Sequence, residues 1–326
     1  WEFLLSEFRS FGGIAENICQ KNGKYGRGIF SLNPNQRSRI FAPSELIIKK
    51  EDIYLESNHL RIKKNKGYST KVREFFNYYQ DNFSWGKGGK ETTESFEKEL
   101  CNFPSNFKEL IKINLSVDIK LRHKGKWNNV VKNQFLNCRA FNFGGNSVIV
   151  PLLELVNHEV NSFPFIKRFN GISTPNYALG KEELTHNYGY TSSIFRVFNY
   201  GFFCKEPIVF SLPFSISIKD SSIKFICKGF DLRDDKIKYH STDDAIILDG
   251  LPIASINKPS FIKDYFEHLW ELINIENINH DIFSKIVDYN CLKRKQILCE
   301  LESLDNLSSQ MIIKAINYEL NTISQV

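Results

Sequence analysis

The order of strand-like and helical patterns constrains the fold of this 326-residue chain most strongly. Short apolar runs at residues 147–150 and 208–212 are typical of strands. A block at about residues 49–135 instead has helical periodicity. Its apolar side chains recur at three- and four-residue spacing: Val72, Phe75, Phe76, Tyr79 and Phe83. The pattern predicts strand-rich segments separated by an inserted helical block.

The two ends of the chain add helices to this arrangement. Near the N-terminus, Phe3, Leu4 and Phe8 lie on one helical face, and Gly12 is suited to end that helix. Near the C-terminus, a helix is predicted to start at Pro259. Further helices are predicted at residues 281–304 and from about residue 308. Many short strands, an inserted helical block and a helical tail predict an α+β fold.

Two more strands are predicted before this helical tail, at residues 215–218 and 223–227, with a turn at residues 220–222. We expect two domains. Residues 1–204 would form a first domain that contains the insertion at about residues 49–135. Residues 205–326 would form a second, mostly helical domain.

Composition excludes several classes of protein. The seven cysteines are scattered without C-x-x-C spacing, which predicts neither a disulfide framework nor a metal site. No apolar run approaches the roughly 20 residues of a membrane span. The net charge of +6 is mild, and the basic runs at residues 61–66 and 122–126 are short. We therefore expect neither nucleic acid nor a membrane as a partner.

Three segments carry unusual polar and aromatic residues. The turn Gly26-Arg27-Gly28 lets backbone groups approach a ligand closely, although such turns are common. The apolar run after Val150 ends in Asn157-His158, which is equally consistent with a capped chain end. Two Tyr-Gly pairs follow, at Tyr188 and Tyr200, and each alone is consistent with an aromatic core.

The order and spacing of these segments resemble the SET-domain lysine methyltransferases. The matching motifs are G-x-G-x-x-S at Gly26, Cys-Arg-Ala-Phe around Arg139, Pro-x₅-Asn-His ending at His158, Asn-Tyr-Gly at Tyr188 and Asn-Tyr-Gly-Phe at Tyr200. The likeness is greatest to the subgroup typified by the enzyme that methylates the Rubisco large subunit. Members of that subgroup carry a helical insertion in the SET domain, a threaded (pseudoknot) C-terminal segment, and a helical substrate-binding domain after it.

The resemblance implies a role for each matching residue. Tyr188 would be the catalytic tyrosine. The cofactor would be S-adenosylmethionine, which leaves as S-adenosylhomocysteine. The resemblance implies that these residues bind it: Tyr25, Gly26, Arg27, Gly28, Arg139, Asn157, His158 and Tyr188. The channel for the substrate lysine would be lined by Glu154, Tyr200 and Phe202.

The implied activity is transfer of methyl groups to the ε-amine of a lysine in a protein or peptide. Departures from the family pattern lie close to Tyr188: His186-Asn187 replace the commoner Ile-Ser, and Ser193 replaces an asparagine. These departures leave a second interpretation open, a weak or inactive SET-fold module that recruits a protein partner. The predicted location is the cytoplasm, or an organelle if a targeting segment precedes Trp1.

Overall fold

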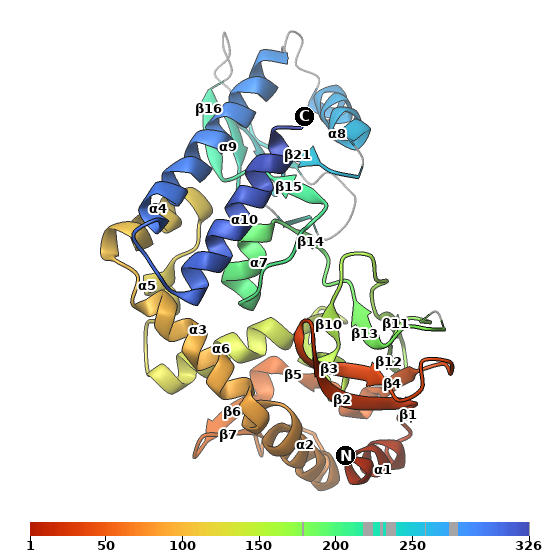
Figure 1. Cartoon of the computed structure of the whole chain (residues 1–326). Coiled ribbons are helices and arrows are strands. Elements are labelled where there is room, and N and C mark those ends of the chain that lie inside the picture. The colour runs from red at the N-terminus through yellow and green to blue at the C-terminus, as the bar shows by residue number, and fades with distance from the viewer. Residues whose placement is uncertain are drawn as a thin grey trace. The chain divides into compact units, whose positions relative to one another are not determined.

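The computed structural model describes residues 1–177, 179–217, 224–228, 231–232, 239–257, 259–273 and 280–325. It combines helices with many short strands, which confirms the predicted α+β class (Figure 1). The predicted turn at residues 220–222, together with residues 218 and 223, lies outside the described residues. None of the helices within the described ranges combines the length and the apolar character that crossing a bilayer requires.

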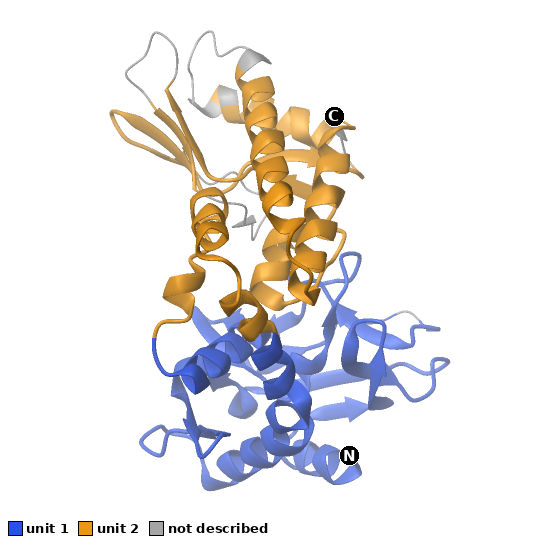
Figure 2. Cartoon of the chain, turned by 60° about the vertical axis from the view of Figure 1, so that its left-hand side comes forward, with its two compact units in different colours: residues 1–95, 125–188 blue, residues 96–124, 189–326 orange. Residues whose placement is uncertain are grey.

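The chain divides into two compact units, which are coloured separately in Figure 2. Unit 1 comprises residues 1–95 and 125–188, and unit 2 comprises residues 96–124 and 189–326. Each unit has its own apolar core. The predicted domains, residues 1–204 and 205–326, stay a prediction. Residues 96–124 and 189–204 belong with the C-terminal part to unit 2.

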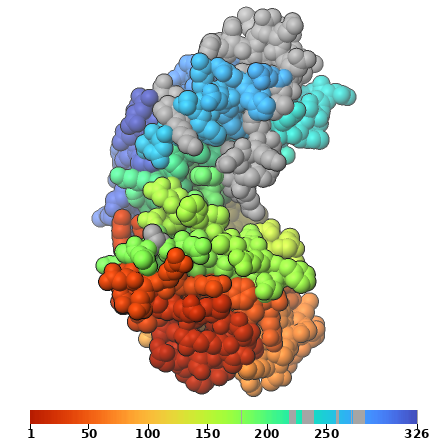
Figure 3. Space-filling model, turned by 90° about the vertical axis from the view of Figure 1, so that its right-hand side faces the viewer, coloured from red at the N-terminus to blue at the C-terminus, as the bar shows by residue number. Residues whose placement is uncertain are grey.

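Unit 1 contains two four-stranded sheets, ordered β1-β4-β12-β11 and β10-β13-β3-β2, a three-stranded sheet β5-β9-β8 and the hairpin β6-β7. The strands are β1 Ile14–Glu16, β2 Ile18–Gly23, β3 Gly26–Ser31, β4 Arg39–Pro43, β5 Ile48–Lys49, β6 Ile53–Glu56, β7 His59–Ile62, β8 Phe141–Phe143, β9 Asn146–Ile149, β10 Asn157–His158, β11 Ile166–Arg168, β12 Gly171–Ser173 and β13 Glu183–His186. The helices are α1 Glu2–Ser10, α2 Thr70–Phe83 and α6 Trp127–Arg139, while α3 Lys90–Cys101 continues into unit 2. Segments distant in sequence therefore adjoin: N-terminal residues (red and orange) and residues around β11–β13 (green) share a surface in Figure 3.

Unit 2 has the helices α4 Ser105–Leu115, α5 Ile119–Arg122, α7 Ser193–Tyr200, α8 Pro259–Ile273, α9 His280–Leu301 and α10 Leu307–Ile323. Its strands are β14 Tyr190–Thr191, β15 Ile208–Phe210, β16 Phe214–Ser217, β17 Lys224–Cys227, β18 Asp231–Leu232, β19 Tyr239–Ser241, β20 Ala245–Leu248 and β21 Pro252–Ser255. The three predicted C-terminal helices are confirmed. Helix α8 starts at Pro259, as predicted. The Asn306 side chain caps the start of α10.

The helical block begins later than predicted. Residues 53–62 form the hairpin of β6 and β7, because Ser57 and Asn58 both adopt positive φ and turn the chain back sharply. Helix α2 starts at Thr70, where the Ser69 hydroxyl accepts the Val72 N–H. The expectation of helix from residue 49 was therefore wrong for residues 53–69, whereas Lys50–Asp52 form a short 3₁₀-helix.

The N-terminal helix was predicted correctly except for one side chain. In α1 the buried residues are Leu4, Leu5 and Phe8, whereas Phe3 is 59% exposed and meets the edge of the Tyr78 ring. After this helix, Gly12 has a φ of +79°, the left-handed conformation that glycine adopts at low cost.

Candidate functional site

A parallel strand pair brings the predicted motifs of unit 1 together. β10 runs parallel to β13, with Asn157 opposite Thr185 and His158 opposite His186. On its other edge, β13 pairs antiparallel with β3, which starts in the glycine turn. The sheet order β10-β13-β3-β2 therefore places the Asn-His motif, the strand leading to Tyr188 and the glycine turn side by side (Figure 1).

Tyr188 is fixed at both its backbone and its hydroxyl. Its N–H donates to Nδ1 of His158 at 3.1 Å, and the two ring centroids are 5.0 Å apart. Its hydroxyl donates to the carbonyl oxygen of Val156 at 3.1 Å. Because the hydroxyl proton is used in this bond, the oxygen presents its lone pairs to other groups. Such an oxygen can orient an incoming N–H donor without ionising.

His186 packs against two aromatic rings. Its imidazole stacks on Phe165 at a centroid distance of 3.7 Å and an interplanar angle of 18°. The centroid of the Tyr188 ring lies 4.5 Å from that of the imidazole. The histidine that departs from the family pattern thus packs against the predicted catalytic tyrosine and restricts its ring.

The glycine turn fits closely against Asn157. A Cβ at Gly28 would lie 2.5 Å from Nδ2 of Asn157 and 2.8 Å from Oε1 of Glu183. Nδ2 of Asn157 donates to that same Glu183 oxygen at 2.8 Å, with the Arg27 carbonyl oxygen 3.4 Å away. Gly28 is therefore needed to leave room for the Asn157 amide. Tyr25, at the tip of the hairpin, is 40% exposed.

Arg139 and Glu154 form a buried polar contact. The Glu154 side chain is fully buried and accepts a hydrogen bond from Nε2 of Gln80 at 2.9 Å. Nε of Arg139 is 3.7 Å from the other Glu154 oxygen, and the guanidinium lies 4.0 Å above the Phe135 ring. The substrate contact expected of Glu154 stays a prediction.

Arg27 extends from the glycine turn towards the end of α2. Its Nη2 donates to the carbonyl oxygen of Ser84 at 2.9 Å. Burial and, after it, the positive charge of Arg139 lower the pKa of Arg27. The carboxylates of Glu154 and Glu91 act on the pKa of Arg27 in the opposite direction.

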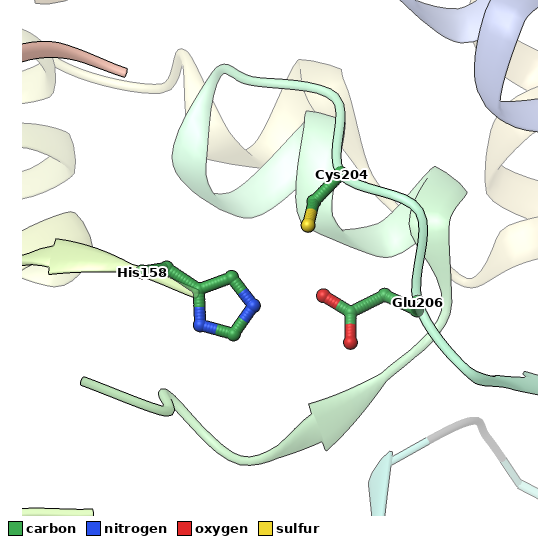
Figure 4. A group of neighbouring side chains, drawn as sticks. All are labelled: His158, Cys204 and Glu206. Atoms are coloured by element: carbon green, nitrogen blue, oxygen red, sulfur yellow. The ribbon is translucent and has the colours of Figure 1, made fainter. Parts of the chain in front are cut away.

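The predicted channel residues Tyr200 and Phe202 belong to unit 2. Tyr200 is the last residue of α7 and Phe202 follows the helix, and their ring centroids are 6.1 Å apart. Figure 4 shows the neighbouring segment, which carries Cys204 and Glu206, and also His158 on β10 of unit 1. Each unit is described by itself, and the channel role of Tyr200 and Phe202 stays a prediction.

Sequence reasoning did not assign a role to Glu183. Its carboxylate contacts Asn157 and covers the glycine turn, so it belongs to the site. Side chains alternate along a strand, so the sequence could have indicated that Glu183 and Thr185 point to the same face. The pairing partner of that strand was not visible in the sequence.

Glu159, next to the site, is a carboxylate held in its charged form by hydrogen bonds. Hydrogen bonds from Lys181, then from Thr185, lower the pKa of Glu159 from 4.5 to about 2. A carboxyl whose pKa is depressed on folding stabilises the fold above its unfolded pKa and loses that contribution as pH falls through its folded pKa.

We therefore expect Glu159→Gln to destabilise unit 1 at pH 7 and to have progressively less effect between pH 4.5 and 2. Because the Glu159 side chain is 37% exposed, the effect should be about 1 kcal/mol or less. Thermal unfolding of both proteins across this pH range measures it. A destabilisation that is the same at pH 2.5 and pH 7 would contradict the assignment.

No protein-family model matches the sequence. No curated protein matches it either.

Three solved structures align with almost the whole chain. One, described as the SET domain of LSMT bound to lysine and AdoHcy, covers 100% of this chain and 89% of its own, at 14% identity and a TM-score of 0.48. Another, described as Rubisco LSMT bound to AdoMet, covers 99% of this chain and 89% of its own, at 15% identity and a TM-score of 0.48. A third, Rubisco LSMT bound to sinefungin and monomethyllysine, covers 99% of this chain and 89% of its own, at 14% identity and a TM-score of 0.47. The SET domain is also the family that the sequence motifs resemble, but TM-scores below 0.5 are too low to support an argument.

Proposed function

We propose that this protein is an S-adenosylmethionine-dependent methyltransferase that acts on the ε-amine of a lysine in a protein substrate. The observation that supports this most is the attachment of Tyr188 to the Asn157-His158 strand. The parallel pair β10-β13 and the bond from Tyr188 N–H to His158 join two motifs that lie 30 residues apart. Separately, each motif is consistent with ordinary core structure.

The residues of unit 1 have the chemistry that this cofactor requires. The methionine part carries a carboxylate, for which the guanidinium groups of Arg27 and Arg139 are suited donors. Its positively charged sulfonium matches the carboxylate of Glu183, and the Asn157 amide offers both a donor and an acceptor. We expect the backbone at Tyr25, Gly26 and Gly28 to border the bound cofactor. S-adenosylmethionine would supply the methyl group on a positively charged sulfonium.

The protein must present the lysine as a neutral, aligned amine. Removing a proton from a free lysine at pH 7 costs about 4–5 kcal/mol. Apolar surroundings lower this cost because they disfavour the charged form. The Tyr188 oxygen, whose proton is donated to Val156, can accept a hydrogen bond from the amine and direct its lone pair. Alignment of this kind contributes roughly 7–11 kcal/mol in well-oriented reactions.

Tyr200 and Phe202 complete the proposal on the substrate side. Their adjacent rings would hold the lysine stem, and a methylated ammonium would be attracted to their faces. The helices of residues 205–326 would bind the protein that carries this lysine. We propose cytoplasmic proteins, rather than nucleic acid or membranes, as partners.

Calorimetric titration with S-adenosylmethionine tests the proposal, and a glycine variant links binding to the site. We expect the wild-type protein to bind and Gly28→Ala to lose about tenfold in affinity, because its methyl group displaces the Asn157 amide. Gly67→Ala is the matched control, since a Cβ there meets nothing within 4 Å.

Incubation with labelled cofactor and cell lysate then tests transfer and identifies the substrate. Binding without any labelled protein would favour the alternative, a SET-fold module that recruits a partner. No binding by the wild-type protein would contradict the cofactor assignment itself.

A further inference from the structure

Glu183 covers the glycine hairpin of unit 1 with a carboxylate. In β13 it lies opposite Phe30 of β3. Its Oε1 lies 2.8 Å from the position that a Cβ would take at Gly28, and its Oε2 lies 3.2 Å from the corresponding position at Gly23. Only the absence of side chains at these two glycines makes room for the carboxylate. Glu183 thus faces the same space as Asn157.

The charge of Glu183 has no close counter-ion among the residues that the structure describes. Its hydrogen-bond donor is the neutral amide of Asn157, at 2.8 Å. Burial raises the pKa of Glu183, and the charge of Glu159 acts in the same direction. Lys181 and Lys24 oppose this only in part, and the Lys181 ammonium is bound to Glu159 at 2.7 Å. A half-buried carboxylate in this position favours a ligand that brings positive charge.

We propose that Glu183 is a specificity-determining residue that makes the site prefer the cationic sulfonium donor to the neutral thioether product. This inference rests on the proposed function. The two ligands share their amino-acid and adenosine parts, and they differ by one methyl group and one positive charge. A carboxylate facing this site therefore distinguishes them mainly through that charge. Preference for the donor would promote exchange of product for fresh cofactor after each transfer.

The size of the effect follows from Coulomb attraction. Two opposite charges several ångströms apart near a protein surface attract each other strongly enough to change affinity about tenfold. Glu183→Gln removes the charge but keeps an oxygen that can accept the Asn157 amide. The variant therefore separates the charge of Glu183 from its role in positioning Asn157.

Calorimetric titrations with S-adenosylmethionine and S-adenosylhomocysteine test the inference. We expect Glu183→Gln to weaken binding of the donor about tenfold and binding of the product less than twofold. Glu182→Gln is the matched control, because this exposed neighbour has the same charge and should change neither affinity. Melting temperatures of all three proteins check that the fold is intact.

The preference should also depend on pH. As acid protonates Glu183, the ratio of donor to product affinity of the wild-type protein should fall towards that of Glu183→Gln, whose ratio should stay flat. Equal losses for both ligands in Glu183→Gln would overturn the inference and assign Glu183 a purely structural role. Unchanged affinities would overturn it as well. If the wild-type protein binds neither ligand, the proposed function fails first and the inference fails with it.

Discussion

Tyr188→Phe is expected to lower the rate of methyl transfer at least about 100-fold while changing the affinity for S-adenosylmethionine less than twofold. Removing one preorganised hydrogen-bonding group from an active site typically costs about 100- to 1,000-fold in rate. The ring would remain packed against His158 and His186, and the backbone bond to His158 would remain. Only the oxygen held by Val156 would be lost. Single-turnover kinetics and calorimetry measure the two quantities separately.

Tyr54→Phe provides the control for this experiment. The Tyr54 hydroxyl bonds to Glu56 within the hairpin of β6 and β7, outside the site, so the same chemical change there should leave the rate unaltered. Wild-type rates in Tyr188→Phe would show that Tyr188 is not the catalytic tyrosine. An equal loss of cofactor affinity would instead indicate that the hydroxyl mainly maintains the position of Val156.

Local sequence signals predicted the individual elements better than their arrangement. The start of α8 follows from Pro259, and the end of α1 follows from Gly12, because both depend on neighbouring residues alone. The hairpin at residues 53–62 was missed because its turn uses Ser57 and Asn58 instead of a glycine. The packing of residues 96–124 with the C-terminal part depends on contacts far apart in sequence, which no local pattern contains.

The same distinction applies to the site. The motif spacing identified Asn157, His158 and Tyr188 as a group, and the strand pairing gives a physical reason for their proximity. Glu183 was not predicted, because its importance depends on facing Gly28 across two paired strands. A buried carboxylate partner for Arg139 was not predicted either, since Glu154 was expected to line the substrate channel. Both omissions concern side-chain contacts between elements that are distant in sequence.

The largest effect on stability is expected from a buried ion pair in unit 2, between Arg294 of α9 and Glu319 of α10. Their side chains are 0% and 1% exposed, and Nε of Arg294 donates to Oε2 of Glu319 at 2.9 Å. The guanidinium also donates to the Phe210 carbonyl oxygen and to Oδ1 of Asn290, so it connects β15 with both helices. Burial raises the pKa of Glu319, which shows the cost of keeping this carboxylate away from water.

Arg294→Met should therefore lower the free energy of unfolding of unit 2 by about 3–5 kcal/mol, because it leaves an uncompensated buried carboxylate. Denaturant unfolding followed by circular dichroism measures this change, and Lys295→Met at an exposed position of the same helix should change it by less than about 0.5 kcal/mol. The double variant Arg294→Met/Glu319→Leu should recover much of the loss, since it removes both charges together. If the double variant is as unstable as Arg294→Met, the hydrogen bonds to Phe210 and Asn290, rather than charge balance, make the arginine necessary.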